Sequence, residues 1–226
     1  MDQRWEDAVF LHWRIPVAAA QARMPPGVRA DVLDGSAWVG LVGFRMHRVR
    51  LGAVLPLPWV GSFPEINVRL YSREPDGTRG VVFRSLDAPR LAVVLGARAA
   101  GIPYVWSRCR AVVTDGTDPA FGYDVERRRG GARSSFAVRP DRAARADDEL
   151  SLELTARFGL HSRFAGRTVH VPVAHDPWPL HPATAVHLED GLVAAAGLDV
   201  GGPPESVLFS PGVRTRIGRP RTVPRS

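Results

Sequence analysis

Alternation of polar and apolar side chains is clearest at residues 65–71. Successive side chains of a β-strand point to opposite faces, so a strand here has one aliphatic and one polar face. The aliphatic positions are Ile66, Val68 and Leu70, and the polar positions are Glu65, Asn67, Arg69 and Tyr71. We predict a strand whose polar face lies either in solvent or inside a curved sheet.

Two neighbouring segments also have strand patterns. Residues 36–46 are apolar on both faces and are interrupted by Gly40 and Gly43, which is typical of the wall of a closed or strongly curved sheet. Residues 80–86 follow the sequence Pro-Asp-Gly-Thr at residues 75–78, a turn signal of the hairpin type. Further strands are expected at residues 104–113, 121–127, 134–139, 167–174, 183–188 and 205–209.

Helical signals are fewer. Asp87 is expected to cap a helix that runs to Ala100, and a short helix is expected at residues 149–158. The first helix is expected to bury Leu91, Val94 and Leu95. With no internal repeat, the pattern predicts one β-rich α+β domain over residues 1–212. A basic C-terminal tail over residues 213–226 lacks periodicity and is expected to be partly extended or mobile.

The composition indicates which classes of protein the chain can belong to. The chain contains 30 basic side chains, all arginine, against 23 acidic ones. The single cysteine, Cys109, excludes an intramolecular disulfide, and no apolar run approaches the roughly 18 residues of a membrane span. We expect a cytoplasmic protein without membrane contact. Most arginines are interleaved with acids, so nucleic-acid binding through the acid-free tail is the less favoured interpretation of the net charge of +7.

The segment Arg-Ala-Ala-Gly-Ile-Pro-Tyr at residues 98–104 resembles the active-site loop of acetoacetate decarboxylases. Arg98, Gly101 and Pro103 match that loop, and Tyr104 stands where the family carries the lysine that forms a Schiff base with the β-keto acid. A phenol cannot condense with a ketone to an iminium ion. The chain is therefore not expected to be a Schiff-base decarboxylase.

Seven blocks along the chain resemble the YqjF-like family of uncharacterised bacterial proteins, which is grouped by fold with the acetoacetate decarboxylases. They are FLHWRIP (10–16), DGSAWVGLVGFRM (34–46), FPEINVRLY (63–71), GVVFRSLDA (80–88), GIPYVWSRC (101–109), HDPWPL (175–180) and SPGVRTRIG (210–218). The resemblance implies a cone-shaped antiparallel β-barrel with a few outer helices. It implies no activity.

The candidate site follows from both lines of argument. The decarboxylases carry a funnel glutamate on the strand before the lysine loop, and the resemblance makes Glu65 its counterpart. If the polar face of this strand lies inside the barrel, the funnel is lined by Glu65, Asn67 and Arg69. Buried charged and polar groups are costly unless they are paired, so these side chains are expected to bond to one another or to a ligand. Arg98 either binds a ligand carboxylate or caps the end of its helix. Tyr104 is either a proton donor to a ligand or an aromatic core residue.

No metal site or cofactor is expected, because no histidine pair has the spacing of a known metal motif and no phosphate-binding glycine loop is present. The leading hypothesis is a pocket protein that binds a small organic acid or ketone. As an enzyme it would use Glu65 as base or acid, Tyr104 as proton donor, and Arg69 or Arg98 as anion clamp, with Asn67 at the ligand. The alternative is a non-catalytic ligand-binding or sensing module. Association of copies of the chain is left open.

Overall fold

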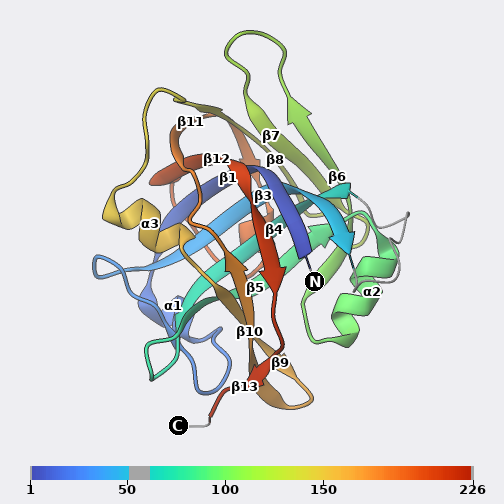
Figure 1. The fold of residues 1–226 in the computed structure, drawn as a ribbon, viewed down its shortest axis with the longest axis vertical. Helices are drawn as coiled ribbons and strands as arrows, with labels where there is room; N and C mark the ends of the chain where they lie inside the picture. The colour runs from blue at the N-terminus through green and yellow to red at the C-terminus, as the bar shows by residue number, and fades with distance from the viewer. Residues whose placement is uncertain (1, 51–61, 225–226) are drawn as a thin grey trace.

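The computed structural model describes residues 2–50 and 62–224 and confirms a β-rich α+β fold (Figure 1). The strands are β1 (Asp2–Ile15), β2 (Arg29–Ala30), β3 (Ala37–Arg50), β4 (Ser62–Arg73), β5 (Arg79–Ala88), β6 (Tyr104–Val113), β7 (Phe121–Arg127), β8 (Arg133–Pro140), β9 (Gly159–Phe164), β10 (Arg167–His175), β11 (His181–Asp190), β12 (Ser206–Ile217) and β13 (Arg221–Thr222). The helices are α1 (Val17–Gln21), α2 (Leu91–Ala99), α3 (Glu149–Thr155) and α4 (Leu192–Ala195).

The described strands belong to one sheet that curls into a partly closed ring. Their hydrogen-bonded order is β13-β10-β9-β5-β6-β7-β8-β11-β12-β1-β3-β4-β2, with β4–β5 and β10–β12 paired in addition. Most pairs are antiparallel, but β5 runs parallel to β6 and β9. The backbone pairing of β5 with β9 is limited to one residue pair, Val81 with Leu160, so few hydrogen bonds join the ring at that seam. Figure 1 shows α2 and α3 on opposite sides of the curled strands.

The faces of β4 confirm the predicted alternation. Ile66, Val68 and Leu70 pack in an apolar cluster between β1, β3 and β4 on one side and β7 and β8 on the other. The opposite face of β4 belongs to what we call the ring side, which comprises two further clusters that include Phe10, Val42, Tyr104, Trp178 and Tyr71. The aliphatic residues of β4 therefore lie outside the ring, and its polar residues lie inside.

Two glycines of β3 allow close packing on its two faces. A Cβ atom added to Gly40 would lie 2.8 Å from the Tyr71 hydroxyl and 3.1 Å from Cδ2 of His12 on the ring side. At Gly43, on the opposite face, an added Cβ would overlap the ring of Tyr123. The predicted glycines of residues 36–46 thus mark two places where a side chain packs directly against the β3 backbone, from β4 at Gly40 and from β7 at Gly43.

The Asp87 prediction was wrong. Asp87 is fully buried in β5 instead of capping a helix, and α2 begins after Arg90 with no side-chain cap. Of the three apolar residues expected to be buried by this helix, Val94 is buried, whereas Leu91 is 43% and Leu95 58% exposed. The Asp-Ala-Pro sequence matched the helix-start pattern, but pairing with β4 up to Asp87 and with β6 up to Ala88 extended the strand instead.

Other parts of the chain also differ from their sequence patterns. Strand β1 was not predicted, although it pairs with both β3 and β12 and passes through the middle of the sheet. The helix at residues 149–158 ends at Thr155, and β9 follows it. The start of the predicted tail is extended, because β12 continues to Ile217 along β1. Among the described residues, no helix is long and apolar enough to cross a membrane.

Candidate functional site

Glu65 and Tyr104 lie together on the ring side. Strand β5 lies between their two strands, pairing Asn67 with Leu86 and Leu86 with Tyr104. This register places the Tyr104 hydroxyl 2.5 Å from Oε2 of Glu65, to which it donates a hydrogen bond. Two of the candidate site residues therefore contact each other directly.

Burial changes the acidity of both groups. Glu65 is 2% exposed, and this burial raises its pKa to about 7; the hydrogen bond from Tyr104 opposes the rise, and the negative charge of Asp87 adds to it. Burial also raises the pKa of Tyr104 well above its ordinary value, with further contributions from the charge of Glu65 and the hydrogen bond. A carboxyl group with a pKa near 7 can both accept and donate a proton at neutral pH.

The Tyr104 ring also packs in the apolar core, with 9% of the residue exposed, so the structural role considered for it is present beside its contact with Glu65. The preceding loop turns through Gly101, which has a φ of +79° and lies against the Arg163 carbonyl, where an added Cβ would overlap that oxygen. Arg98 is exposed, and its Nε donates to the Tyr104 carbonyl oxygen at 2.6 Å. Through this hydrogen bond, the exposed Arg98 side chain stabilises the loop.

Arg69 lies farther along the ring side of β4. Its guanidinium carbon is 5.5 Å from the ring centres of both Phe10 and Tyr71. Its Nε donates to the Tyr71 hydroxyl at 3.3 Å, and Nη2 donates to the Leu154 carbonyl at 3.4 Å. Among the described residues, no carboxylate forms an ion pair with Arg69. A half-buried cation without an acid is a candidate anion site.

Some buried polar atoms on the ring side lack a hydrogen-bond partner in the described part of the chain. They include Oδ1 of Asn67, a residue that is 1% exposed, and Nε2 of His12, which is fully buried. Burial and the charges of Arg69 and Arg157 lower the pKa of His12 well below its ordinary value, so the ring is neutral. Neither His12 nor Tyr71 was predicted to belong to the ligand site, although both lie in the blocks that carry the family resemblance.

The outer face of β5 carries a separate ion pair that supports the site. Asp87 accepts hydrogen bonds from Nε of Arg127 at 2.9 Å and from the Ser107 hydroxyl at 2.7 Å. Arg127 also donates to Ser85 at 2.8 Å. With its charge paired inside the protein, Asp87 ties β5 to β6 and β7 and holds the strand between Glu65 and Tyr104 in place.

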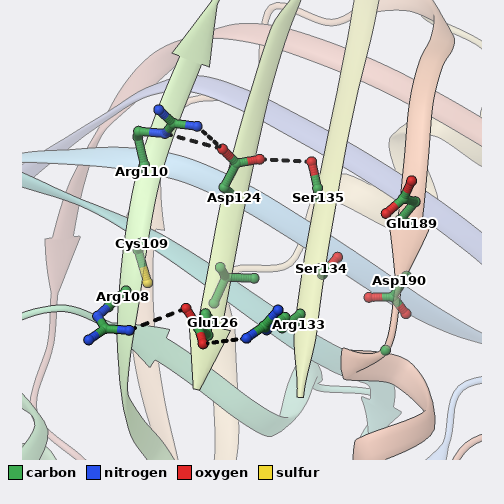
Figure 2. Close-up of a pocket in the computed structure, with 12 residues that line it drawn as sticks. Arg108, Cys109, Arg110, Asp124, Glu126, Arg133, Ser134, Ser135, Glu189 and Asp190 are labelled. Atoms are coloured by element: carbon green, nitrogen blue, oxygen red, sulfur yellow. Dashed lines mark hydrogen bonds and ion pairs between the residues drawn. The ribbon is translucent and has the colours of Figure 1, made fainter. Parts of the chain in front are cut away.

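A cavity of about 610 Å³ lies elsewhere, over β6, β7, β8 and the end of β11 (Figure 2). All of its arginines pair with acids that line it, as in Arg110 with Asp124 at 2.6 Å and Arg133 with Glu126 at 2.8 Å. Burial raises the pKa of the Cys109 thiol at this cavity, which disfavours the reactive thiolate. The cavity contains none of the predicted site residues.

One group of described residues has the chemistry of a metal site. Glu74, His161 and His170 are buried, and their potential ligand atoms all lie within 4.8 Å of one another. They follow or belong to three different strands, β4, β9 and β10. The sequence did not predict this group, because linear spacing says nothing about residues that meet across a sheet.

Comparisons with known proteins agree with the fold. The profile of the DUF2071 family, described as an uncharacterized conserved protein, matches residues 2–214. The uncharacterized protein YqjF of Bacillus subtilis is 30% identical over 211 residues, which cover 91% of this chain and 84% of that relative.

Solved structures with the same fold have low sequence identity. An acetoacetate decarboxylase from Legionella pneumophila matches with a TM-score of 0.71 and 14% identity, covering 99% of this chain and 88% of its own. The enduracididine biosynthesis enzyme MppR complexed with pyruvate matches at 0.68 and 16%, covering 99% and 90%. An acetoacetate decarboxylase-like enzyme from Sphingomonas wittichii matches at 0.68 and 12%, covering 100% and 93%. These similarities establish the fold.

Proposed function

This chain belongs to the DUF2071 family of uncharacterized conserved proteins, and we propose that it binds a small oxo acid on the ring side and moves a proton on it without forming an imine. The observation that carries the proposal is the pair of Glu65 and Tyr104, enclosed at 2.5 Å with a carboxyl pKa near 7. Arg69 supplies a positive charge on the same face of β4.

The chemistry assigns one role to each group. The ligand carboxylate pairs with the Arg69 guanidinium, which has no acid of its own among the described residues and can donate two parallel hydrogen bonds. Asn67, between Glu65 and Arg69 along the strand, offers its amide to the bound ligand. The Glu65 carboxylate takes a proton from the carbon next to the ligand carbonyl. Once Glu65 is protonated, the Tyr104 hydroxyl turns away from it and donates its one hydrogen to the enolate oxygen that forms. Return of the proton from Glu65 completes the cycle.

The absence of lysine excludes the main alternative mechanism. With no lysine in the sequence, no side-chain amine can form the iminium ion that drives decarboxylation of β-keto acids in enzymes with a catalytic lysine. The pyruvate in the MppR structure belongs to that protein, but it shows that a neighbour of this fold holds an oxo acid.

A non-catalytic binding module is the second candidate. The packing of the Tyr104 ring in the apolar cluster favours it, because a side chain that helps to fill the core can be retained for stability alone. A nucleic-acid interface on the C-terminal arginines is less favoured. Residues 213–217 belong to β12, and Arg221 forms an ion pair with Glu74; Arg225 lies outside the described residues.

Binding and exchange measurements separate these functions. Calorimetry with pyruvate, acetoacetate and acetone is expected to show that Arg69→Gln weakens binding of the two acids about 10- to 100-fold, with little effect on acetone. Arg110→Gln, at an exposed ion pair, is the matched control. Equal affinities of wild type and Arg69→Gln for the acids would disprove the anion clamp.

Proton movement is tested by deuterium. In D2O, NMR is expected to show wild-type protein incorporating deuterium at the methyl carbon of pyruvate, and Glu65→Gln losing this exchange while still binding the acid. Binding without exchange above the buffer rate in the wild type would establish the non-catalytic module instead.

A further inference from the structure

The group formed by Glu74, His161 and His170 lies at the seam of the ring, away from the proposed ligand site. Glu74 follows the last residue of β4, and the two histidines face each other across the β9–β10 pair. Their rings are 5.0 Å apart between centres, and Nε2 of His161 lies 3.0 Å from Oε1 of Glu74. Three potential ligands from separate chain segments thus converge at one point.

His161 is oriented by a second contact. The hydroxyl of Ser72, a fully buried residue of β4, lies 2.8 Å from Nδ1 of His161. This contact leaves Nε2 directed at Glu74, an arrangement common for metal-binding histidines, whose second nitrogen is held by a polar neighbour. The row of serine, histidine and glutamate is not a hydrolase triad, because the hydroxyl of a fully buried serine cannot reach a substrate.

The unpartnered ring of His170 is a second sign that this group binds a ligand. The residue is 6% exposed, and neither of its ring nitrogens has a hydrogen-bond partner within the described ranges. A buried polar atom without a partner is costly, and a bound ligand offsets that cost. Space for the two rings comes from glycine: an added Cβ would overlap Nε2 of His170 at Gly159 and would lie 3.0 Å from Nδ1 of His161 at Gly80.

Arg221 is the one cation that contacts this group in the described structure. It lies on β13, directly across from His170, and its two terminal nitrogens lie 2.9 and 2.5 Å from the oxygens of Glu74. Its side chain is 41% exposed, so it can move aside. A metal ion and Arg221 therefore compete for the charge of the same carboxylate.

We propose that Glu74, His161 and His170 form a binding site for a divalent transition-metal ion, with zinc the best match. Two imidazoles and a carboxylate are a common zinc ligand set, with bonds of about 2.0–2.2 Å. Such bonds need ligand atoms roughly 3.4 Å apart in tetrahedral geometry, a small contraction of the present group. The ion joins the end of β4 to β9 and β10, near the seam where the described backbone pairing of β5 with β9 is limited to Val81 and Leu160. It therefore strengthens the closure of the ring.

Titration of the metal-free chain with zinc, in competition with a chromogenic chelator, tests the site. Wild type is expected to bind one ion per chain and to gain thermal stability, because the folded state binds the ion more tightly than the unfolded chain does. Cobalt in the same site is expected to give the intense visible absorption of a tetrahedral complex. His170→Gln should weaken zinc binding at least 10-fold, whereas His187→Gln, an exposed histidine of β11, should leave it unchanged.

Arg221→Gln is expected to change the zinc affinity in the opposite direction. Removing the competing guanidinium should tighten zinc binding several-fold, and this exposed substitution leaves the buried ligands in place. The proposal is overturned if the wild type binds zinc more weakly than about 100 µM, on the order of incidental surface binding. It is also overturned if His187→Gln and His170→Gln lose zinc affinity to the same extent. If His170→Gln does not fold, unchanged or weaker binding by Arg221→Gln overturns it.

Discussion

The Tyr104 hydroxyl donates to the Glu65 carboxylate at 2.5 Å across 39 residues of sequence, and one strand, β5, holds the two together. The carboxyl group is buried, and its polar partner, the Tyr104 phenol, belongs to the apolar cluster that also contains Phe10 and Val42. Each group therefore depends on the other for a hydrogen bond. The acid–base properties of the site follow from this pairing.

Tyr104→Phe should lower the free energy of unfolding by about 1–3 kcal/mol, because the buried Glu65 is left without its donor. It should also raise the pKa of Glu65 further, since the hydrogen bond from Tyr104 lowers that pKa in the intact protein. Urea denaturation and carbon NMR of the labelled glutamate carboxyl measure the two effects. A fall in the pKa of Glu65 would contradict the assigned direction of the bond.

The raised pKa of Glu65 makes stability depend on pH. The folded protein keeps the proton up to pH 7, whereas the unfolded chain releases it near pH 4.5. Below pH 4.5 both states are protonated, so the contribution of the neutral acid is fully present; it is lost as pH rises to 7. The expected loss is about 3 kcal/mol. Urea unfolding from pH 4.5 to 8 should show this decline in wild type and a shallower one in Glu65→Gln. Parallel profiles for the two proteins would refute it.

Gly40→Ala should destabilise the protein by about 1–3 kcal/mol and weaken oxo-acid binding, because the added methyl meets the Tyr71 hydroxyl at 2.8 Å and His12 at 3.1 Å. Gly96→Ala is the matched control. No atom lies within 4 Å of its added Cβ, and replacement of a helical glycine by alanine is expected to stabilise by about 0.5–1 kcal/mol. Thermal unfolding with and without pyruvate measures both. Equal effects of the two substitutions would show that β3 tolerates a side chain at residue 40.

Borohydride reduction in the presence of acetoacetate or pyruvate should leave no adduct on any internal peptide. The α-amino group of Met1 is the one primary amine of the chain, because the sequence contains no lysine. Peptide mapping by mass spectrometry reads the result directly. A reduced adduct mapped to residues 101–109 would show that the loop still performs imine chemistry.

Local patterns in the sequence determined much of the fold. Period-two alternation placed Glu65, Asn67 and Arg69 on the face of β4 opposite Ile66 and Leu70, because the geometry of an extended chain permits no other arrangement. The hairpin of β6 and β7 begins and ends at the predicted residues, since its turn and flanking strands are contiguous in sequence. The absence of lysine excluded imine chemistry by composition alone.

Only tertiary structure decided which face of each element is enclosed. Strand alternation does not say which side faces the ring, and the family resemblance rather than the pattern pointed the polar face of β4 inward. The sequence around Asp87 predicted a helix cap. In the structure Asp87 lies in a buried strand, because β5 pairs with β4 and the charge of Asp87 is paired with Arg127. Glu74, His161 and His170 lie up to 96 residues apart in sequence, and they meet because β9 and β10 pair beside the end of β4. Long-range contacts of this kind depend on which strands become neighbours, and no local pattern of side chains contains that information.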